Sequence, residues 1–247
     1  MSVAGVDAST IVVDPGRPAL VAGVLRIDPR AVRLHLVPGS KEPGNGLLSD
    51  GAVAPADRTA LIAAFNAGFK MKQSNGGWFS AGATPVPLTA GAASLVLRDD
   101  GAAQVGIWGR DVTMDAHVIA VRQNLTLLVD GGVPTPGVSS PDYEGMWGKT
   151  IHHLRAVPRS GVGITAQGTL VYVAGRGLLV GDLAQALVAA GAVRAMELDI
   201  NPQFVDAYTY ASGPSGPVGT PLIPGLRYGP EHYLLPQERD FVEVLSR

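Results

Sequence analysis

The residues best suited to chemistry lie in segment 195–201, where polar and apolar side chains alternate. In an extended strand the three polar side chains share one face, and these are Glu197, Asp199 and Asn201. Two carboxyl groups two residues apart raise the pKa of one of them, as a general acid requires. Because buried acids cost free energy unless they are paired or hydrogen-bonded, this face is either solvated or lines a site.

Two further segments place polar side chains beside small residues. Asn66 and Lys70 share a strand face with a glycine, and Arg159 shares one with Gly161 and Gly163. Glycine inside a strand often marks the close approach of a ligand or of another backbone. An antiparallel strand with one solvated face gives the same alternation, so both interpretations stay open at this point.

Composition limits the class of protein. The chain has 247 residues, of which 46% are hydrophobic, enough for a sizeable core. Only 16% are charged, and the 32 glycines and 19 prolines favour many turns and short elements over long helices. The net charge of −2, from 19 basic and 21 acidic residues, argues against general nucleic-acid binding, which usually shows a basic surplus.

Motifs that the sequence lacks exclude several kinds of site. There is no cysteine, which rules out disulfides and Cys-ligated metals, and there is no P-loop, dinucleotide fingerprint or GxSxG elbow. His152 and His153 are adjacent and would point to opposite faces of a strand, so they are not a simple pair of metal ligands. The spacing predicts no metal site and no cofactor, although carboxylate and carbonyl oxygens can hold calcium without a recognisable motif. The N-terminal residues do not resemble a signal peptide, and no apolar run reaches the ~18 residues of a membrane span.

The elements that position these side chains are mostly short strands. Strands are predicted over residues 11–13, 22–27, 31–37, 61–69, 93–97, 103–108, 125–129, 161–165, 169–174, 195–201 and 239–245. A helix is predicted over 183–190, with Gly191 as its natural stop, and 71–88 is predicted as a loop. Segment 211–236 is rich in proline, glycine and serine, and loops of this length are usually functional or poorly ordered.

Together these elements predict one domain over residues 1–247. Its expected class is α+β or α/β, strand-rich, with a mixed β-sheet and few helices. The sequence contains no internal repeat, and no second block of apolar periodicity follows Asn201. A single strand-rich domain of this length is common.

Several short motifs, taken in order, resemble the phosphodiester glycosidase family. They are residues 66–69 (NAGF), 87–88 (PL), 91–94 (GAAS), 159–163 (RSGVG) and 198–199 (LD). The resemblance runs from about residue 25 to residue 201 and includes bacterial relatives. It implies cleavage of the bond between a sugar anomeric carbon and a phosphate oxygen.

The resemblance and the residue pattern together give expected roles for individual residues. Asp199 matches the family aspartate, and Glu197 is the expected second catalytic acid. The expected substrate-binding residues are Arg159, Asn66, Lys70, Gly161, Asn201 and His153. A guanidinium binds phosphate oxygens through two parallel hydrogen bonds, which suits Arg159 as the phosphate ligand.

Each of these roles has a structural alternative. Arg159 is equally explained by a structural ion pair with Glu197, and Asn66 by a turn in which its side chain bonds nearby backbone. Lys70 is either a solvated charge or a phosphate contact. His153 is of a type that more often lies in a polar loop than in a catalytic site.

One departure from the family pattern follows Asp199. The family commonly carries a glycine run there, which offers backbone N–H groups to phosphate, whereas residues 200–204 read INPQF. The leading function is hydrolysis of a sugar phosphodiester or related glycosidic bond, in a cell-envelope polymer. The rivals are a non-catalytic carbohydrate-binding domain and a structural envelope protein. By resemblance the partner is a carbohydrate or sugar phosphate, and the location is extracellular or at the envelope.

Overall fold

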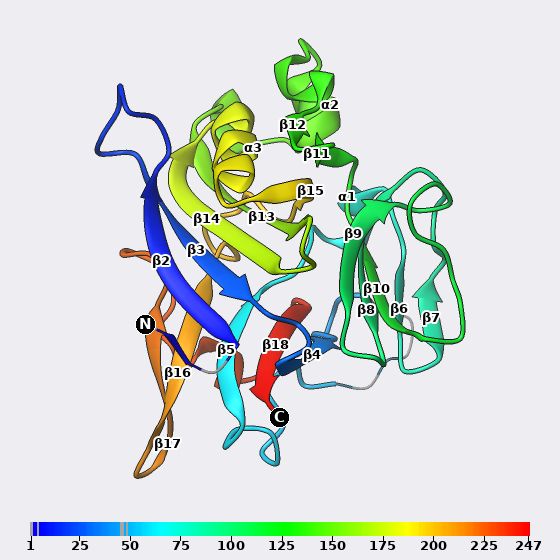
Figure 1. Ribbon diagram of the computed structural model, residues 1–247, viewed down its shortest axis with the longest axis vertical. Coiled ribbons are helices and arrows are strands. Elements are labelled where there is room, and N and C mark those ends of the chain that lie inside the picture. The colour runs from blue at the N-terminus through cyan, green and yellow to red at the C-terminus, as the bar shows by residue number, and fades with distance from the viewer. Residues whose placement is uncertain (1, 4, 45–46, 48) are drawn as a thin grey trace.

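The computed structural model describes residues 2–3, 5–44, 47 and 49–247, and the strands within them form three sheets. The largest sheet lies at the upper left of Figure 1, with helix α3 (Val180–Ala189) packed on one face. In the described chain its strands, in spatial order, are β1 (Ser2–Val3), β2 (Val6–Val12), β3 (Val21–Ile27), β14 (Leu170–Leu178), β13 (Val157–Thr165), β15 (Ala192–Glu197), β11 (Leu127–Asp130) and β12 (Val133–Pro134).

The two smaller sheets lie below and beside the largest one (Figure 1). The order of the first is β17 (Gly216–Pro221), β16 (Ala207–Gly213), β5 (Leu61–Asn66), β18 (Phe241–Ser246) and β4 (Val32–Val37). The order of the second is β7 (Ala83–Val86), β6 (Trp78–Ser80), β10 (Val118–Gln123), β8 (Ala93–Arg98) and β9 (Ala103–Ile107).

Helices are short and few in the described residues, so the protein is strand-rich, as predicted, and mostly β. Besides α3 there are α1 (Met71–Ser74) and α2 (Tyr143–Trp147), and single 3-10 turns at Pro136–Ser139, Ile151–His153 and His232–Leu234. The label α+β or α/β therefore fits only loosely.

The predicted mixed sheet is wrong, because every strand pairing in the described chain is antiparallel. The reason is visible at α3, which connects β14 to β15. Both strands pair with β13 and are antiparallel to it, so they run parallel to each other but are not neighbours. Short connections join some of the remaining neighbours, such as β6 and β7, β8 and β9, and β16 and β17, and such connections produce antiparallel pairs.

Most of the predicted elements are present. The helix starts three residues earlier than expected, and the hairpins β8–β9 and β13–β14 form around Gly101 and Gly168, both in the left-handed region, with φ of 83° and 85°. Strand β10 was not predicted, and the predicted loop 71–88 contains α1, β6 and β7.

Two segments differ from expectation in ways that affect the site. Part of segment 211–236 belongs to the β16–β17 hairpin, in which β17 tolerates its prolines because it is an edge strand. Strand β15 ends at Glu197 instead of continuing to residue 201. The alternating row of acids is therefore not one strand face.

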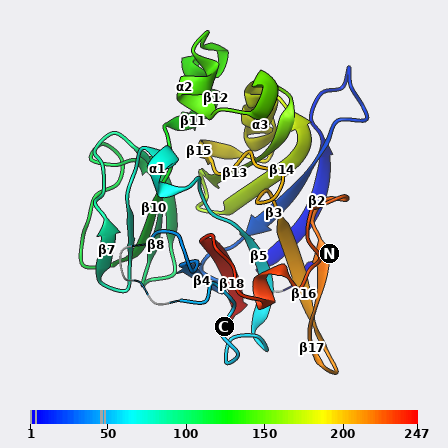
Figure 2. The ribbon, with the colours of Figure 1, turned by 180° about the vertical axis from the view of Figure 1, so that it is seen from behind.

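The three sheets meet at the ends of four strands: β5, β10, β15 and β18 (Figure 2). Hydrogen bonds cross between the sheets there, from Asn66 Nδ2 to Ser160 Oγ at 3.0 Å and from Arg122 Nε to Asp240 Oδ2 at 2.7 Å. The main hydrophobic core cluster contains residues of all three sheets, such as Leu25, Phe65 and Leu95. Loops leaving these strand ends are thus held close together.

Candidate functional site

A cleft of about 410 Å³ lies where these loops meet, and we call it the Asp199 cleft. Its walls come from the start of α1, from α2, from the turn after β15 and from the residues before β18. The charged residues that line it are Lys70, Glu144, Lys149, Asp199 and Arg239. Three cations and two carboxyl groups around one opening suit an anionic ligand and acid–base chemistry.

Asp199 lies in a tight turn that its own carboxylate closes. Oδ1 accepts hydrogen bonds from the backbone N–H groups of Ile200 and Asn201 at 2.7 and 2.8 Å, and Oδ2 accepts one from Arg239 Nη2 at 2.9 Å. Burial raises the pKa of Asp199 above its ordinary value, although Arg239 and the two backbone bonds oppose the rise. Backbone bonds to β13 still continue here, from Leu198 N–H to the Ser160 carbonyl at 2.8 Å and from Ser160 N–H to the Asp199 carbonyl at 2.9 Å, so the chain turns only after Asp199.

Arg239 is the cleft residue that sequence reasoning missed most clearly. Its Nη2 also donates to the Gly68 carbonyl at 2.6 Å, and its guanidinium lies 4.6 Å from the centroid of the Phe204 ring. Its Nε is buried without a hydrogen-bond partner in the described residues. The only signal in the sequence is an Arg-Asp pair at the start of the predicted strand 239–245, and that signal does not indicate a partner.

Glu197 and Arg159 form an ion pair in which both side chains are 0% exposed. Arg159 Nη1 lies 2.5 Å from Glu197 Oε1, its Nε donates to the Leu178 carbonyl at 3.0 Å, and its Nη2 donates to the Tyr143 hydroxyl. Burial raises the pKa of Glu197 to about 7, against the opposing charge of Arg159, and the charge of Asp199 adds to the rise. This geometry matches the structural alternative stated for Arg159.

Asn66 ends strand β5 inside a buried polar network. Its Nδ2 donates to Ser160 Oγ at 3.0 Å and to the Ala67 carbonyl at 2.9 Å, while its Oδ1 accepts from the Tyr172 hydroxyl at 2.7 Å. Ser160 Oγ in turn accepts from the backbone N–H of Asp199 at 3.2 Å. Asn66 therefore supports the Asp199 turn from behind.

Lys70 and Asn201 line the cleft and are exposed, and their role as binding residues stays a prediction. Lys149, which the sequence analysis did not single out, lines it from the segment after α2 and is also exposed. Exposed ammonium groups keep their rotational freedom, so Lys70 and Lys149 can follow a mobile anionic group.

His153 reaches the cleft through Glu144. Its Nδ1 lies 2.7 Å from Glu144 Oε1, and its side chain is 85% exposed. His152 and His153 have left-handed backbone conformations, with φ of 60° and 54°, so they do not point to opposite faces of a strand as the sequence analysis assumed. Glu144 is a second cleft carboxylate that sequence reasoning did not identify.

Gly161 is explained by helix packing. A Cβ built on it would lie 2.9 Å from the Met196 carbonyl oxygen and 3.0 Å from Leu187 Cδ1, and Leu187 belongs to α3. The close approach that a strand glycine permits here is therefore that of α3 and the neighbouring strand.

The predicted convergence of Arg159, Asp199 and Asn66 on one concavity is not what the structure has. Of these three residues, only Asp199 lines the cleft. The predicted residues that do line it are Asp199, Lys70 and Asn201. The polar face predicted for Glu197, Asp199 and Asn201 is therefore neither solvated nor part of a site wall at Glu197, because Glu197 is buried.

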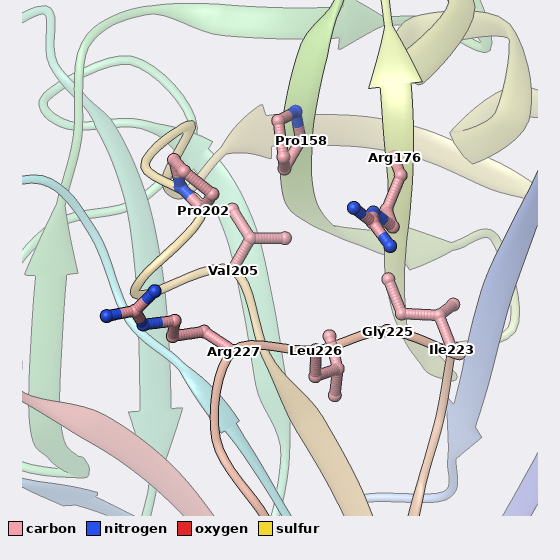
Figure 3. A pocket seen from close by; sticks show the side chains of 8 residues that line it. All are labelled: Pro158, Arg176, Pro202, Val205, Ile223, Gly225, Leu226 and Arg227. Atoms are coloured by element: carbon pink, nitrogen blue, oxygen red, sulfur yellow. The ribbon is translucent and has the colours of Figure 1, made fainter.

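A smaller hollow of about 150 Å³ lies beyond Pro202, in the loop that follows Asp199. Figure 3 shows Arg176 and Arg227 on opposite sides of it, with the apolar side chains of Ile223 and Leu226 on the segment that also carries Arg227. None of the described residues lining it is acidic. This hollow therefore has no carboxyl group for acid–base chemistry, unlike the Asp199 cleft.

Comparison with known proteins assigns the chain to a class. The family model of the phosphodiester glycosidases matches residues 59–199, which is more than half of the chain. The chain therefore belongs to the phosphodiester glycosidase family, as its motifs predicted. No curated protein matches the chain significantly.

Two solved structures share the fold. The catalytic domain of zebrafish N-acetylglucosamine-1-phosphodiester alpha-N-acetylglucosaminidase, auto-inhibited by its pro-peptide, is 15% identical with a TM-score of 0.62, over 98% of this chain and 83% of that one. A hypothetical protein from Synechocystis is 13% identical with a TM-score of 0.51, over 98% and 62%. At these identities the likeness concerns the fold. No helix among the described residues has the length and apolar character needed to cross a membrane.

Proposed function

We propose that this chain hydrolyses a sugar phosphodiester, or a related glycosidic bond next to a phosphate, at the Asp199 cleft. The observation that carries the proposal is the charge of the cleft, where Lys70, Lys149 and Arg239 surround two carboxyl groups. A neutral glycoside has no charge for such a set of cations to match, whereas a phosphodiester does. Family membership supports the same reaction class.

In this proposal the leaving group needs charge stabilisation more than a proton. Water attacks the anomeric carbon, the bond from that carbon to the phosphate oxygen breaks, and the phosphate leaves with the electron pair. Lys70 and Lys149 stabilise the charge on the phosphate. Glu144, which solvent reaches, accepts the proton of the attacking water, and Asp199 stabilises the positive charge that develops on the sugar.

The turn after Asp199 changes how phosphate is held. The N–H groups of Ile200 and Asn201 bond the Asp199 carboxylate, so they are not offered to a ligand. A glycine run at this place would offer such groups to phosphate. We therefore assign phosphate binding to side chains, and Lys70 and Lys149 are the exposed candidates.

One observation favours the non-catalytic rival, a carbohydrate-binding domain. Asp199 has three donors on its two oxygens and is only 3% exposed, so little of it is open to a substrate. A cleft that binds a sugar phosphate without cleaving it would need only the cations.

The test uses two substrates that share one sugar, a sugar 1-phosphodiester and a nitrophenyl glycoside. We expect the wild type to hydrolyse the phosphodiester, which is measured by the release of the phosphomonoester. Asp199→Asn and Glu144→Gln should each lower kcat about 100-fold or more, the usual contribution of an acid–base or charged group. Asp100→Asn is the matched control, since Asp100 is an exposed acid of the β8–β9 hairpin, and it should leave kcat unchanged.

The rival makes a different forecast for the same proteins. Calorimetric binding of the sugar phosphodiester without any turnover would replace the hydrolase by the binding domain. Teichoic-acid fragments extend the same assay to a cell-envelope polymer, the substrate source that we propose together with an extracellular or envelope location.

A further inference from the structure

A group of three potential metal ligands lies outside the Asp199 cleft, on β4, on β18 and in the turn before β5. His35 of β4 stands directly opposite Glu243 of β18 in the antiparallel register, and His35 Nδ1 lies 2.9 Å from Glu243 Oε1. Asp57, in the turn before β5, completes the group, in which one ligand atom of each residue lies within 4.8 Å of the others. None of the three lines the cleft.

Glu243 is the unusual member of this group. Successive side chains of β18 point to opposite faces of the sheet, and Glu243 lies on the same face as the buried Phe241 and Leu245. The residue is only 3% exposed, and its Oε2 has no hydrogen-bond partner in the described chain. An ionised carboxylate in such a place needs a compensating positive charge.

The protein's own cations supply that charge poorly. His35 is charged only when it is protonated, and its side chain is 42% exposed. Arg33 lies 3.9 Å from Asp57. Arg58 follows Asp57 in the sequence, but its guanidinium donates to the carbonyl groups of Val53 and Leu234.

We propose that His35, Asp57 and Glu243 bind a divalent transition-metal ion, of which Zn²⁺ fits best. One imidazole nitrogen and two carboxylate oxygens are zinc ligands, and an all-oxygen set would be expected for calcium or magnesium. Tetrahedral ligands at ~2.0–2.2 Å from zinc lie roughly 3.3–3.6 Å apart, so small side-chain rotations close the group. Three protein ligands leave one position for water.

Access and consequence both follow from the location. Glu243 lines a surface hollow of about 330 Å³ together with Asp50 and Val53, which gives water and an ion a route to its carboxylate. A bound ion would join β4 and β18 to the turn that contains Asp57. It would therefore stabilise the sheet of β4, β5 and β16–β18 and would act independently of the proposed hydrolase activity.

The experiment titrates the chelator-treated 247-residue chain with Zn²⁺ alone, by calorimetry and by thermal unfolding. We expect one ion per chain and a rise in Tm, because a ligand that binds only the folded state stabilises it. His35→Gln and Glu243→Gln should each weaken binding at least tenfold and remove most of the rise in Tm. Mg²⁺ at the same concentration should have no effect on Tm.

A matched control tests whether any exposed histidine–carboxylate pair gives the same signal. His117 Nδ1 lies 3.1 Å from Asp99 Oδ1 in an exposed pair outside the group, so His117→Gln should bind Zn²⁺ like the wild type. In chelator, Glu243→Gln should be at least as stable as the wild type, because it removes an uncompensated buried charge. The proposal is overturned by a wild type that binds no Zn²⁺, by undiminished binding in both His35→Gln and Glu243→Gln, or by loss of binding in His117→Gln.

Discussion

Charged side chains near the Asp199 cleft fall into two groups according to their exposure. Lys70 and Lys149 are exposed on the cleft wall, where they can contact a ligand directly. Arg159 and Glu197 are completely buried and bond to each other. Substitutions in the first group should change activity, whereas substitutions in the second should change stability.

The first residue-scale prediction concerns Lys70. Lys70→Ala should raise KM for a sugar 1-phosphodiester about tenfold, because a charged contact to phosphate is lost. A tenfold change corresponds to a binding free energy of ~1.4 kcal/mol. The neutral glycoside of the same sugar should change less than about twofold. Steady-state kinetics on both substrates measures the difference.

The control for this prediction lies two residues further along the chain. Lys72 is exposed in α1 but does not line the cleft, so Lys72→Ala should leave both KM values unchanged. Equal effects of Lys70→Ala and Lys72→Ala would mean that only the general positive field matters.

The second residue-scale prediction concerns Arg159. Arg159→Met should lower the free energy of unfolding by about 3–5 kcal/mol, because it leaves Glu197 buried without its partner. The double variant with Glu197→Gln should recover part of that loss, because no buried charge remains. Urea unfolding of the single and double variants measures the coupling, and additive losses would contradict a structural ion pair.

At the scale of elements, α3 determines which residues β13 can carry. The helix packs on the largest sheet, and its Leu183 and Leu187 lie above Gly161. Ordinary side chains there would collide with the helix, so the glycine permits a close helix–sheet contact. Strand pairing with β13, in which Gly161 stands opposite Glu197, holds β15 and hence the turn of Asp199 beside it.

A pair of glycine substitutions tests this contact. Gly161→Ala should lower the free energy of unfolding by about 1–3 kcal/mol, because the new Cβ overpacks against Met196 and Leu187. Gly181→Ala, in the first turn of α3, meets nothing within 4 Å and should be neutral or stabilising by up to about 1 kcal/mol. Chemical denaturation of both variants decides the matter, and a neutral Gly161→Ala would mean that α3 moves freely.

At the scale of the whole molecule, buried polar groups connect the three sheets. Arg122 of β10 pairs with Asp240, next to β18, at 2.7 Å, and Asn124 Nδ2 donates to the carbonyl groups of Glu197 and Leu198 at 2.8 and 3.1 Å. Bonds between elements so distant in sequence require all three sheets to be in place. The stability of the site should therefore follow the stability of the whole fold.

A pH dependence of this stability is expected from Asp206, another buried acid near the place where the three sheets meet. Burial raises its pKa to about 8, and the charge of Asp199 adds to the rise. The folded state then holds a proton that the unfolded state has already lost, so stability falls as pH rises toward and through 8. Between pH 7 and 9 the loss should be about 1.4 kcal/mol.

The pH range of 7 to 9 is chosen because other buried groups contribute little to the pH dependence there. Burial lowers the pKa of His232 to about 4, so its contribution rises with pH only up to about 6.5 and is complete by pH 7. Glu197, with its pKa of about 7, adds only a small loss above pH 7. Asp206→Asn should flatten most of the dependence in urea unfolding at pH 7, 8 and 9, and an unchanged slope would assign it elsewhere.

The sequence by itself determined much of the local structure. Period-2 patterns and turn residues located most strands, and glycines at positions such as Gly101 and Gly168 located the hairpins. The motifs in residues 66–199 were sufficient to predict the family, which the family model confirms. These features depend on residues close in the chain, so a single sequence contains them.

Only the tertiary structure decided which polar groups meet. Asp199 and Glu197 are two residues apart, yet one lines a cleft and the other is buried in an ion pair, because the chain turns after β15. Arg239 meets Asp199 across 40 positions, and Glu144 enters the cleft from α2. Strand periodicity indicates which side chains share a face but not what covers that face, because the packing between sheets determines which elements lie against it.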